Sequence, residues 1–199
     1  MPPLDLVLLH APSVYDFREH SILYGPVSDL VPSTPVFEMY PIGFTTIAEY
    51  LEQRGWRVRI VNLALRMLRD ARFDAEALIR QLNPAAFGID LHWLPHAHGA
   101  LAVAELVKRH HPRTPVIFGG FSASYYHEEL LRLPSVDYVV RGDSTEEPMH
   151  RLLECIKAGR EPEGVPNVAW RSSGGTVKAN PLSYIPPDLD HVALDYGFV

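Results

Sequence analysis

The sequence predicts an α/β fold: a doubly wound, Rossmann/flavodoxin-like parallel sheet of about five strands with flanking helices, plus a small C-terminal β-hairpin and tail. Short runs rich in β-branched and aromatic residues alternate with amphipathic segments along most of the chain. Three of these runs are nearly continuous apolar stretches, which is expected for strands that helices cover on both faces. Right-handed crossovers would then place the strands side by side in one parallel sheet.

Six short runs are the expected strands. They comprise residues 5–10, 56–62, 86–90, 114–118, 136–141 and 167–171. The last run begins a segment, residues 167–178, that is typical of a hairpin because a Ser-Gly-Gly sequence at residues 173–175 favours a tight turn. Residues 180–199 have no helical or strand period and are interrupted by prolines, so we expect a tail there.

Three segments have the apolar spacing of amphipathic helices. Their apolar positions are Phe44, Ile47, Ala48 and Leu51; Ala100, Val103, Ala104 and Val107; and Met149, Leu152, Leu153 and Ile156. Pro41 and Gly55 bound the first, as helix starts and ends prefer. A capping-box pattern at residues 144–147 opens the third. Shorter helices are expected at residues 74–82 and 125–133, each closed by a following proline.

Composition excludes several classes of protein. The 199 residues include 18 Lys and Arg against 24 Asp and Glu, and this acidic balance argues against a nucleic-acid binder. No run reaches the length of a membrane span, and the N-terminus lacks the basic region of a signal peptide, so we expect a cytoplasmic protein. A single cysteine, Cys155, excludes an internal disulfide, a cysteine-based zinc site and a self-contained iron–sulfur cluster.

Ligands of such sheets bind beyond the carboxyl ends of the strands, where the strand order reverses. The segment that follows the first strand, residues 11–40, is long, rich in proline and aromatic residues, and without helical period. Loops of this length are usually functional or disordered, and this one is too aromatic for a disordered linker. A cover over a large, flat, partly apolar ligand and an ordered structural excursion are about equally supported.

Three shorter segments follow later strands. They are residues 90–95, 119–124 and 142–144. Gly119 and Gly120 are informative because residues without side chains let a ligand approach the backbone closely. They do not form a dinucleotide fingerprint, because no G-x-G-x-x-G follows the first strand, and the chain has no P-loop lysine. Taken alone, a glycine pair after a strand is more often a tight turn.

Three segments together resemble a known family. The segment from Pro41 to Val58, the segment Val116–Gly120 with the following Glu128–Leu131, and the D-Y-V-V-R-G-D stretch at residues 137–143 are similar to motifs of the cobalamin (vitamin B12)-binding domain. The similarity is greatest to the version that forms the N-terminal domain of B12-dependent radical-SAM proteins. It covers about residues 5–158, and the tail is similar to the linker that leads into the radical-SAM barrel.

The resemblance implies that the chain binds cobalamin at the C-terminal edge of the sheet and presents it to a radical-SAM catalytic domain. Glycines and Ser122 would lie under the corrin ring and nucleotide tail, the segments at 90–93 and 142–144 would form the rim, and the 11–40 loop would give partial cover. The expected cofactor-binding residues are Pro12, Ser13, Asp90, Leu91, His92, Trp93, Gly119, Gly120, Phe121, Ser122, Gly142, Asp143 and Ser144. No catalytic residue and no protein metal ligand are expected.

The sequence departs from the family pattern in two places. Asp90 stands where related domains often have Ser or Thr, and a carboxylate accepts hydrogen bonds but does not donate them. The D-x-H-x-x-G motif, whose His coordinates cobalt in one branch of the family, is absent, because Phe17 and Arg18 follow Asp16. We therefore expect cobalt without an imidazole from that motif. His20, in the same loop, is expected to face solvent rather than replace it.

The catalytic half of a radical-SAM enzyme is missing, because the C-x3-C-x2-C cluster motif is absent. Cys155 lies on the apolar face of the last helix and is expected to be a small core residue. S-adenosylmethionine and a [4Fe–4S] cluster would then belong to an absent domain of the same polypeptide, a methyltransferase or cyclase. Residues 1–160 would form the cobalamin-binding domain, and residues 161–199 a hairpin and linker. The end of the chain at Val199 favours a fragment over a stand-alone relative.

Other functions stay open. The fold could have lost cobalamin and serve as an interaction or substrate-docking module. A receiver-like signalling domain would place an acidic cluster at Asp90 and Asp5, but Arg141 stands where its lysine is needed. His92 and His96 have helical metal-site spacing, together with nearby His98. Pro95 breaks that helix, so structural or solvent-facing roles are favoured, with a corrin-edge contact from His92 next. A Ser-His-Asp hydrolase is excluded, because no G-x-S-x-G elbow follows a strand.

Overall fold

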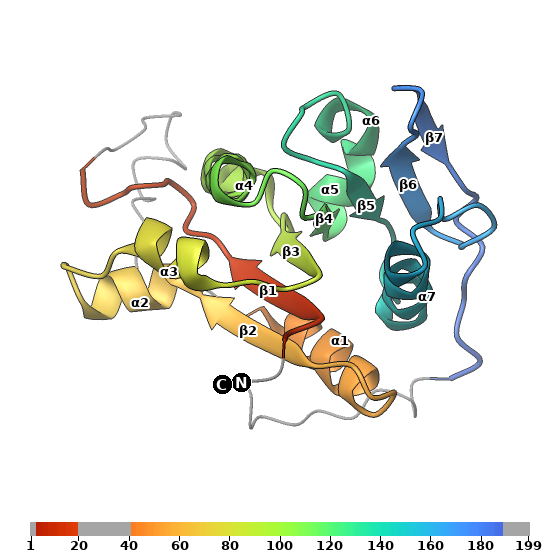
Figure 1. Cartoon of the computed structure of the whole chain (residues 1–199), viewed down its shortest axis with the longest axis horizontal. Helices are drawn as coiled ribbons and strands as arrows, with labels where there is room; N and C mark the ends of the chain where they lie inside the picture. Colours follow the sequence, from red (N-terminus) through yellow and green to blue (C-terminus); the bar gives the residue numbers. More distant parts are fainter. Residues whose placement is uncertain (1–2, 20–40, 189–199) are drawn as a thin grey trace.

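The computed structural model describes residues 3–19 and 41–188. These residues form one sheet of seven strands in the order β2-β1-β3-β4-β5-β6-β7, with helices on both faces (Figure 1). The predicted α/β class is confirmed. Of the cover predicted at residues 11–40, the part from residue 20 to residue 40, which includes His20, lies outside the described residues.

Five strands form the parallel part of the sheet. They are β1 (Leu6–His10), β2 (Val58–Asn62), β3 (Ala86–Asp90), β4 (Val116–Gly119) and β5 (Tyr138–Val140). β1 pairs with β2 on one side and with β3 on the other, and each later strand adds to the β3 side. The strand order therefore reverses between β1 and β3, which is where such sheets bind ligands.

The C-terminal hairpin belongs to the same sheet. β6 (Val168–Arg171) pairs antiparallel with β5, and β7 (Val177–Ala179) pairs antiparallel with β6. The predicted hairpin is confirmed, including its turn, where Gly175 N–H donates to the Ser172 carbonyl at 2.8 Å. The expectation of about five strands counted only the parallel part, because the sequence pattern of a hairpin does not show which strand edge it joins.

The helices divide between the two faces. One face carries α1 (Ile42–Glu52) and α7 (Glu146–Lys157). The other carries α2 (Leu63–Arg69), α3 (Ala75–Gln81), α4 (Ala97–His110), α5 (Phe121–Tyr125) and α6 (His127–Leu130). A single 3₁₀ turn, η2 (Leu94–His96), leads into α4. Figure 1 shows α1 and α7 on the side of the sheet away from α4.

The three longest predicted helices are confirmed as α1, α4 and α7, and residues 74–82 contain α3. The helix expected at residues 125–133 is instead two short helices, of which the first begins earlier, at Phe121, and the second begins at His127, with Tyr126 between them. α2 was not expected from the sequence. Its N-cap residue is Asn62, whose side chain accepts a hydrogen bond from the Leu65 amide at 2.8 Å.

The capping box predicted at the start of α7 is wrong. The N-cap residue, Thr145, makes no side-chain cap hydrogen bond. The two acidic residues that follow bind α1 instead: Thr46 donates to Glu146 and Tyr50 donates to Glu147, each at 2.8 Å. Burial and then the Glu147 contact raise the pKa of Tyr50 to about 12, so its hydroxyl stays a donor. The carboxylates tie the two helices together rather than capping one.

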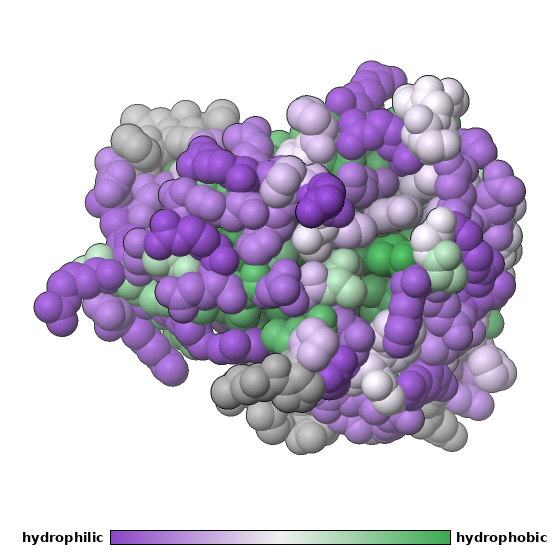
Figure 2. Space-filling view, viewed as in Figure 1, coloured by the Kyte–Doolittle hydropathy of each residue, from purple (hydrophilic) through white to green (hydrophobic). Residues whose placement is uncertain are grey.

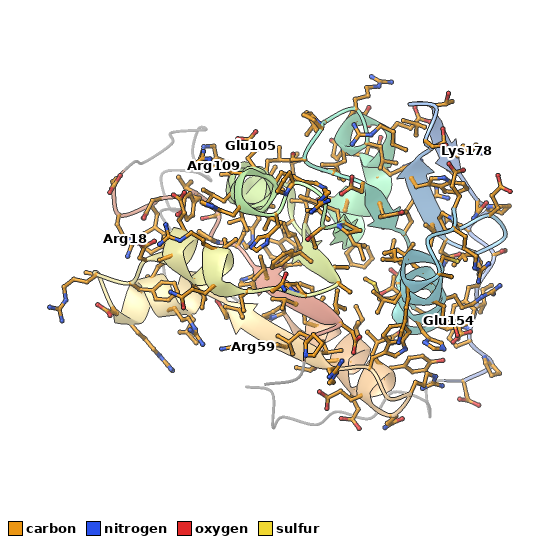
Figure 3. The ribbon with its side chains drawn as sticks, viewed as in Figure 1. Arg18, Arg59, Glu105, Arg109, Glu154 and Lys178 are labelled. Atoms are coloured by element: carbon orange, nitrogen blue, oxygen red, sulfur yellow. The ribbon has the colours of Figure 1, made fainter. Side chains whose placement is uncertain are left out.

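Two apolar clusters form the core, one on each face of the sheet. Alternate residues of β1 separate between them: Val7 and Leu9 pack with α2, α3 and α4, whereas Leu6 and Leu8 pack with α1 and α7. Cys155 lies in the second cluster as predicted, and burial raises the pKa of its thiol. Charged side chains such as Arg59, Glu105 and Glu154 lie at the periphery (Figure 3). Among the described helices, none is long and apolar enough to cross a membrane.

Glu161 is expected to tie the hairpin to the preceding segment in a pH-dependent way. Its carboxylate accepts from the Ser173 amide at 2.9 Å, from Lys178 at 3.1 Å and from Trp170 at 3.3 Å, and these donors lower its pKa to about 2. Because the folded pKa lies below the ordinary carboxyl value, its stabilisation is complete above that value and is lost as pH falls towards 2.

The measurement is the difference in thermal midpoint between the wild-type chain and Glu161→Gln across that pH range. We expect the variant to melt lower at neutral pH and the two midpoints to converge in acid. A difference that stays constant with pH would show that the ionised carboxylate is not the cause.

Candidate functional site

A cavity of about 410 Å³ opens at the carboxyl ends of the parallel strands, on the sheet face that α1 and α7 cover. Its volume lies within the range of about 300–1,000 Å³ that is usual for small-molecule sites. The cavity includes the point between β1 and β3 where the strand order reverses. Its position is therefore the one that the sequence predicted for a ligand.

Two rows of sheet residues form the floor. Strand register places Leu8, Gly88 and Ile117 side by side in the deeper row, and Asp90 beside Gly119 in the row at the strand ends. The deeper row has no polar side chain. A Cβ on Gly88 would lie 2.6 Å from Leu8 Cδ2, so a side chain there would force that methyl group to move. Gly119 is open, because among the described residues a Cβ there would meet only the Val140 carbonyl oxygen, at 3.7 Å.

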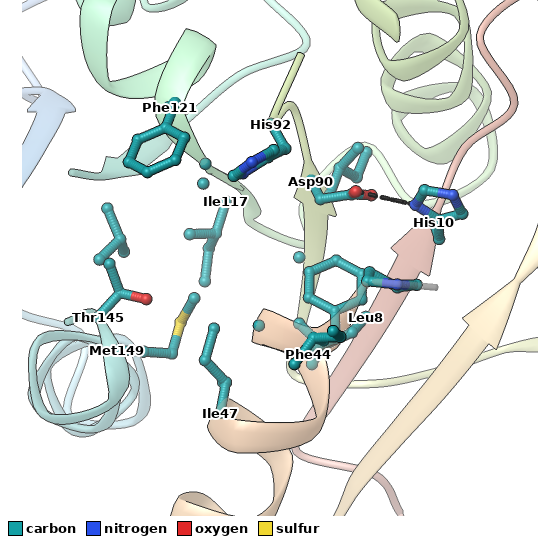
Figure 4. A pocket seen from close by; sticks show the side chains of 18 of the residues that line it. Leu8, His10, Phe44, Ile47, Asp90, His92, Ile117, Phe121, Thr145 and Met149 are labelled. Carbon is teal, nitrogen blue, oxygen red and sulfur yellow. Dashed lines mark hydrogen bonds and ion pairs between the residues drawn. The ribbon is translucent and has the colours of Figure 1, made fainter. Parts of the chain in front are cut away.

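The walls come from the two helices on this face. Phe44 and Ile47 of α1 and Met149 of α7 are each less than a tenth exposed and border the cavity (Figure 4). Thr145 adds a hydroxyl near the start of α7. The cavity is thus a slot between two helices with a sheet beneath it, apolar in its depth and polar at its mouth. In Figure 2, hydrophobic residues gather between the sheet and α7 on an otherwise mostly hydrophilic face.

His10 and Asp90 meet across the two strands at the strand-order reversal. Both carboxylate oxygens of Asp90 lie within 3.0 Å of His10 Nδ1, and the His10 side chain is almost fully buried. The His96 ring lies 5.9 Å from the His10 ring, centroid to centroid. Asp90 therefore holds the imidazole at the mouth of the slot, and its oxygens are already engaged by that ring.

The turn after β4 depends on Gly120. This residue has φ +105°, and a Cβ there would lie 2.8 Å from the backbone N and Cα of His92. The loops after β3 and β4 are therefore in direct backbone contact. The Leu91 amide donates to Gly119 at 2.7 Å, and the Ala123 amide donates to Leu91 at 3.1 Å. The glycine pair joins two loops that border the cavity.

Aromatic side chains stand on these joined loops. His92 lies 4.6 Å from Phe121 and 6.5 Å from Trp93, ring centroid to ring centroid. Phe121 and Trp93 are each about half exposed, at 55% and 48%. Leu94 and Tyr125 are exposed nearby on the same two loops and α5. The rim of the slot therefore has an apolar outer surface.

Of the residues predicted for the site, eight line the cavity. These are Asp90, His92, Trp93, Gly119, Gly120, Phe121, Gly142 and Asp143. Ser144 adjoins it in sequence without lining it. Ser122 hydrogen-bonds the His92 carbonyl at 3.1 Å, and Leu91 is buried in the core of the opposite face. Pro12 and Ser13 pack against Gly99 of α4 instead. These five are placed beside the site rather than in its lining.

The sequence prediction missed the slot's walls and deeper floor. The missed lining residues are Leu8, His10, Pro41, Ile42, Gly43, Phe44, Ile47, Gly88, Ile89, His96, Ile117, Val140, Thr145 and Met149. Most belong to the apolar faces of helices or strands, and nothing in their spacing distinguishes a slot from a filled core. The sequence did contain one signal. Gly88 interrupts an otherwise apolar strand, and a glycine there often marks a place where a ligand or another backbone approaches the strand closely.

The acidic cluster of a receiver-like domain and a metal site, both considered from the sequence, do not form among the described residues. Asp5 lies at the amino end of β1, where it accepts from the Arg57 amide, so the suggestion that it joins Asp90 is wrong. Arg141 contacts the Asn180 carbonyl and His127. Burial lowers the pKa of this guanidinium. Within residues 3–19 and 41–188, no three His, Cys, Asp or Glu side chains are grouped to hold a metal.

The sequence and the fold are similar to those of known proteins. The family model for the B12 binding domain matches residues 29–151. Cytidylyl-2-hydroxyethylphosphonate methyltransferase of Streptomyces wedmorensis is 26% identical over 182 residues, which cover 79% of this chain and 33% of that protein.

Two solved structures share the fold. The radical S-adenosylmethionine methyltransferase TsrM of Kitasatospora setae, with cobalamin and a [4Fe–4S] cluster bound, aligns at TM-score 0.64 and 19% identity, over 89% of this chain and 31% of that one. The cobalamin-dependent S-adenosylmethionine radical enzyme OxsB aligns at TM-score 0.62 and 13% identity, over 92% of this chain and 23% of that one. The chain thus spans about a third or less of each of these relatives.

Proposed function

The chain belongs to the B12-binding domain family, and from this premise we propose that it binds cobalamin over the carboxyl ends of β1, β3 and β4 and presents it to a radical-SAM catalytic domain. One observation carries the proposal: an apolar slot lies beside a strand edge that glycine keeps open. A corrinoid combines a broad ring with a long nucleotide tail. The ring suits the open strand edge, and the tail suits the slot.

The residues present fit such a cofactor. Gly119, Gly120 and Gly142 leave the strand ends without side chains where the ring would rest. His92 and Thr145 offer polar groups at the mouth for the ring's amide edge. The slot between α1 and α7 is sized for part of the cofactor, which we assign to the tail. Cobalamin, when bound, supplies a cobalt centre that carries methyl groups or takes part in radical chemistry.

The partner would dock on the rim. Trp93 and Phe121 line the cavity and are about half exposed, and Leu94 and Tyr125 are exposed on the same two segments of the chain. Exposed apolar side chains that gather on a surface indicate an interaction site. We propose that a radical-SAM domain of the same polypeptide covers them, with residues 1–160 as the cofactor domain and residues 161–199 as the hairpin and linker. The iron–sulfur cluster and S-adenosylmethionine would then belong to that other domain.

The direct test mixes the purified chain with hydroxocobalamin, removes free ligand by gel filtration and records the visible spectrum of the protein peak. We expect corrin absorbance to elute with the protein. Calorimetry at high ligand concentration repeats the test for a weak complex. A colourless protein peak with no heat of binding would overturn the proposal and favour the same fold acting as an interaction or docking module.

A further inference from the structure

The depth of the slot differs chemically from its mouth, and this difference bears on which part of a ligand it accepts. Leu8, Ile117, Ile47 and Met149 surround the deep end, and each is less than a tenth exposed. The polar lining residues at the strand ends are His10 and Asp90. Each lies two residues beyond the deeper row on its strand, and so nearer the carboxyl edge of the sheet. A ligand that enters from the mouth therefore passes from polar to apolar surroundings.

The deep end offers no hydrogen-bonding side chain among the described lining residues. The strands beneath it pair with their neighbours through the sheet, so their backbone groups are already engaged. A polar group that a ligand brought there would lose its water without gaining a partner, and that loss weakens binding. An apolar ring would instead gain contacts with aliphatic side chains and with the Met149 thioether.

The volume limits what can enter. A cavity of about 410 Å³ encloses a drug-sized fragment and not a whole corrinoid, so only one end of the cofactor enters it. The end that is flat and carries little polarity is the heteroaromatic base of the nucleotide tail.

We infer that the deep end of the slot, formed by Leu8, Ile47, Ile117 and Met149, selects among corrinoids by the polarity of their lower base. It accepts the dimethylbenzimidazole of cobalamin and discriminates against bases that carry hydrogen-bonding substituents. This inference rests on the proposed function, because it concerns the same cofactor, and it adds a specificity that membership of the family does not supply.

The test compares three corrinoids by spectroscopic titration of the full chain. A base that enters the slot must first detach from cobalt. Cobalamin and the cobamide with hydroxybenzimidazole in place of dimethylbenzimidazole share the same kind of cobalt-coordinating nitrogen, so this detachment requires a similar free energy in both. We expect the hydroxylated compound to bind about tenfold or more weakly. Cobinamide, which lacks the tail, should also bind more weakly than cobalamin.

Two variants of one residue locate the selectivity. Met149→Gln places an amide of similar size in the slot, so it should narrow the affinity difference between the two cobamides. Met149→Leu keeps the slot apolar and should preserve the difference. An unchanged difference in a folded Met149→Gln chain would overturn the assignment to this slot. If that variant does not fold, the wild-type series still decides.

The outcomes separate the two proposals. Equal affinities for cobalamin and the hydroxybenzimidazole cobamide, or for cobalamin and cobinamide, would overturn the inference of base selectivity while leaving cobalamin binding in place. Failure of all three corrinoids to bind would instead overturn the proposed function.

Discussion

Replacing Gly119 by leucine is expected to abolish cobalamin binding while the fold stays intact. Gly119 lines the cavity at the end of β4, and in the described part of the chain a Cβ there meets only the Val140 carbonyl oxygen, at 3.7 Å. The new side chain would occupy the open mouth of the slot instead of disturbing the sheet. We expect the affinity for hydroxocobalamin to fall by at least about a hundredfold, equivalent to about 2.7 kcal/mol.

Calorimetric titration and urea unfolding of the same variant separate binding from stability. The free energy of unfolding should change by less than about 1 kcal/mol, because a strand glycine contributes little packing. Gly174→Leu is the matched control. It makes the same substitution in the exposed hairpin turn, where the nearest other atom is Ser172 Oγ at 3.9 Å, and it should bind like wild type. If Gly119→Leu bound hydroxocobalamin as tightly as wild type, the cofactor would not bind at this edge of the sheet.

Gly99→Ala is expected to cause the largest loss of stability among Gly→Ala substitutions at the glycines that the structure describes. A Cβ at Gly99 would lie 1.7 Å from the Pro12 carbonyl oxygen and 2.8 Å from its carbon, and both atoms are backbone. The Gly99 amide also donates to the Ser13 carbonyl at 3.0 Å. Relief would require α4 to move away from the segment after β1. We expect the free energy of unfolding to fall by about 3 kcal/mol or more.

Urea denaturation followed by circular dichroism measures this loss as a shift in midpoint at constant slope. Gly43→Ala in α1 is the control, because a Cβ there meets no atom of the described residues within 4 Å. Alanine is the better helix former, so this variant should match wild type or gain about 0.5–1 kcal/mol. If Gly99→Ala were as stable as Gly43→Ala, the close approach of α4 to Pro12 would not exist in solution.

Much of the fold follows from local pattern. The six predicted strand segments all contain strands, because each combines β-branched or aromatic residues with a clear break at either end. The start of α7 shows the limit of such reasoning. Its acidic residues have the sequence of a cap, yet Glu146 and Glu147 bind Thr46 and Tyr50 of a helix about a hundred residues earlier. A partner so distant in the sequence leaves no local signal.

The candidate site divides in the same way. Gly119 and Gly120 could be predicted, because glycines at the end of a buried strand let a ligand or a neighbouring backbone approach closely. The pairing of His10 with Asp90 could not, because it depends on the register of two strands eighty residues apart. From the sequence alone, the wall residues Ile47 and Met149 cannot be distinguished from ordinary core residues. Only the spacing of α1 from α7 turns an apolar face into a slot.

Hydrogen exchange with and without cobalamin tests most directly where the cofactor binds. The amides of Ile42–Ile47, Gly119–Phe121 and Thr145–Met149 should exchange more slowly in the complex, because these segments line the slot from three different elements. The amides of α3 and the outer turns of α4, on the opposite face, should exchange at the same rate in both states. Protection confined to that opposite face, or none at saturating cobalamin, would contradict a binding site between α1, α7 and the strand ends.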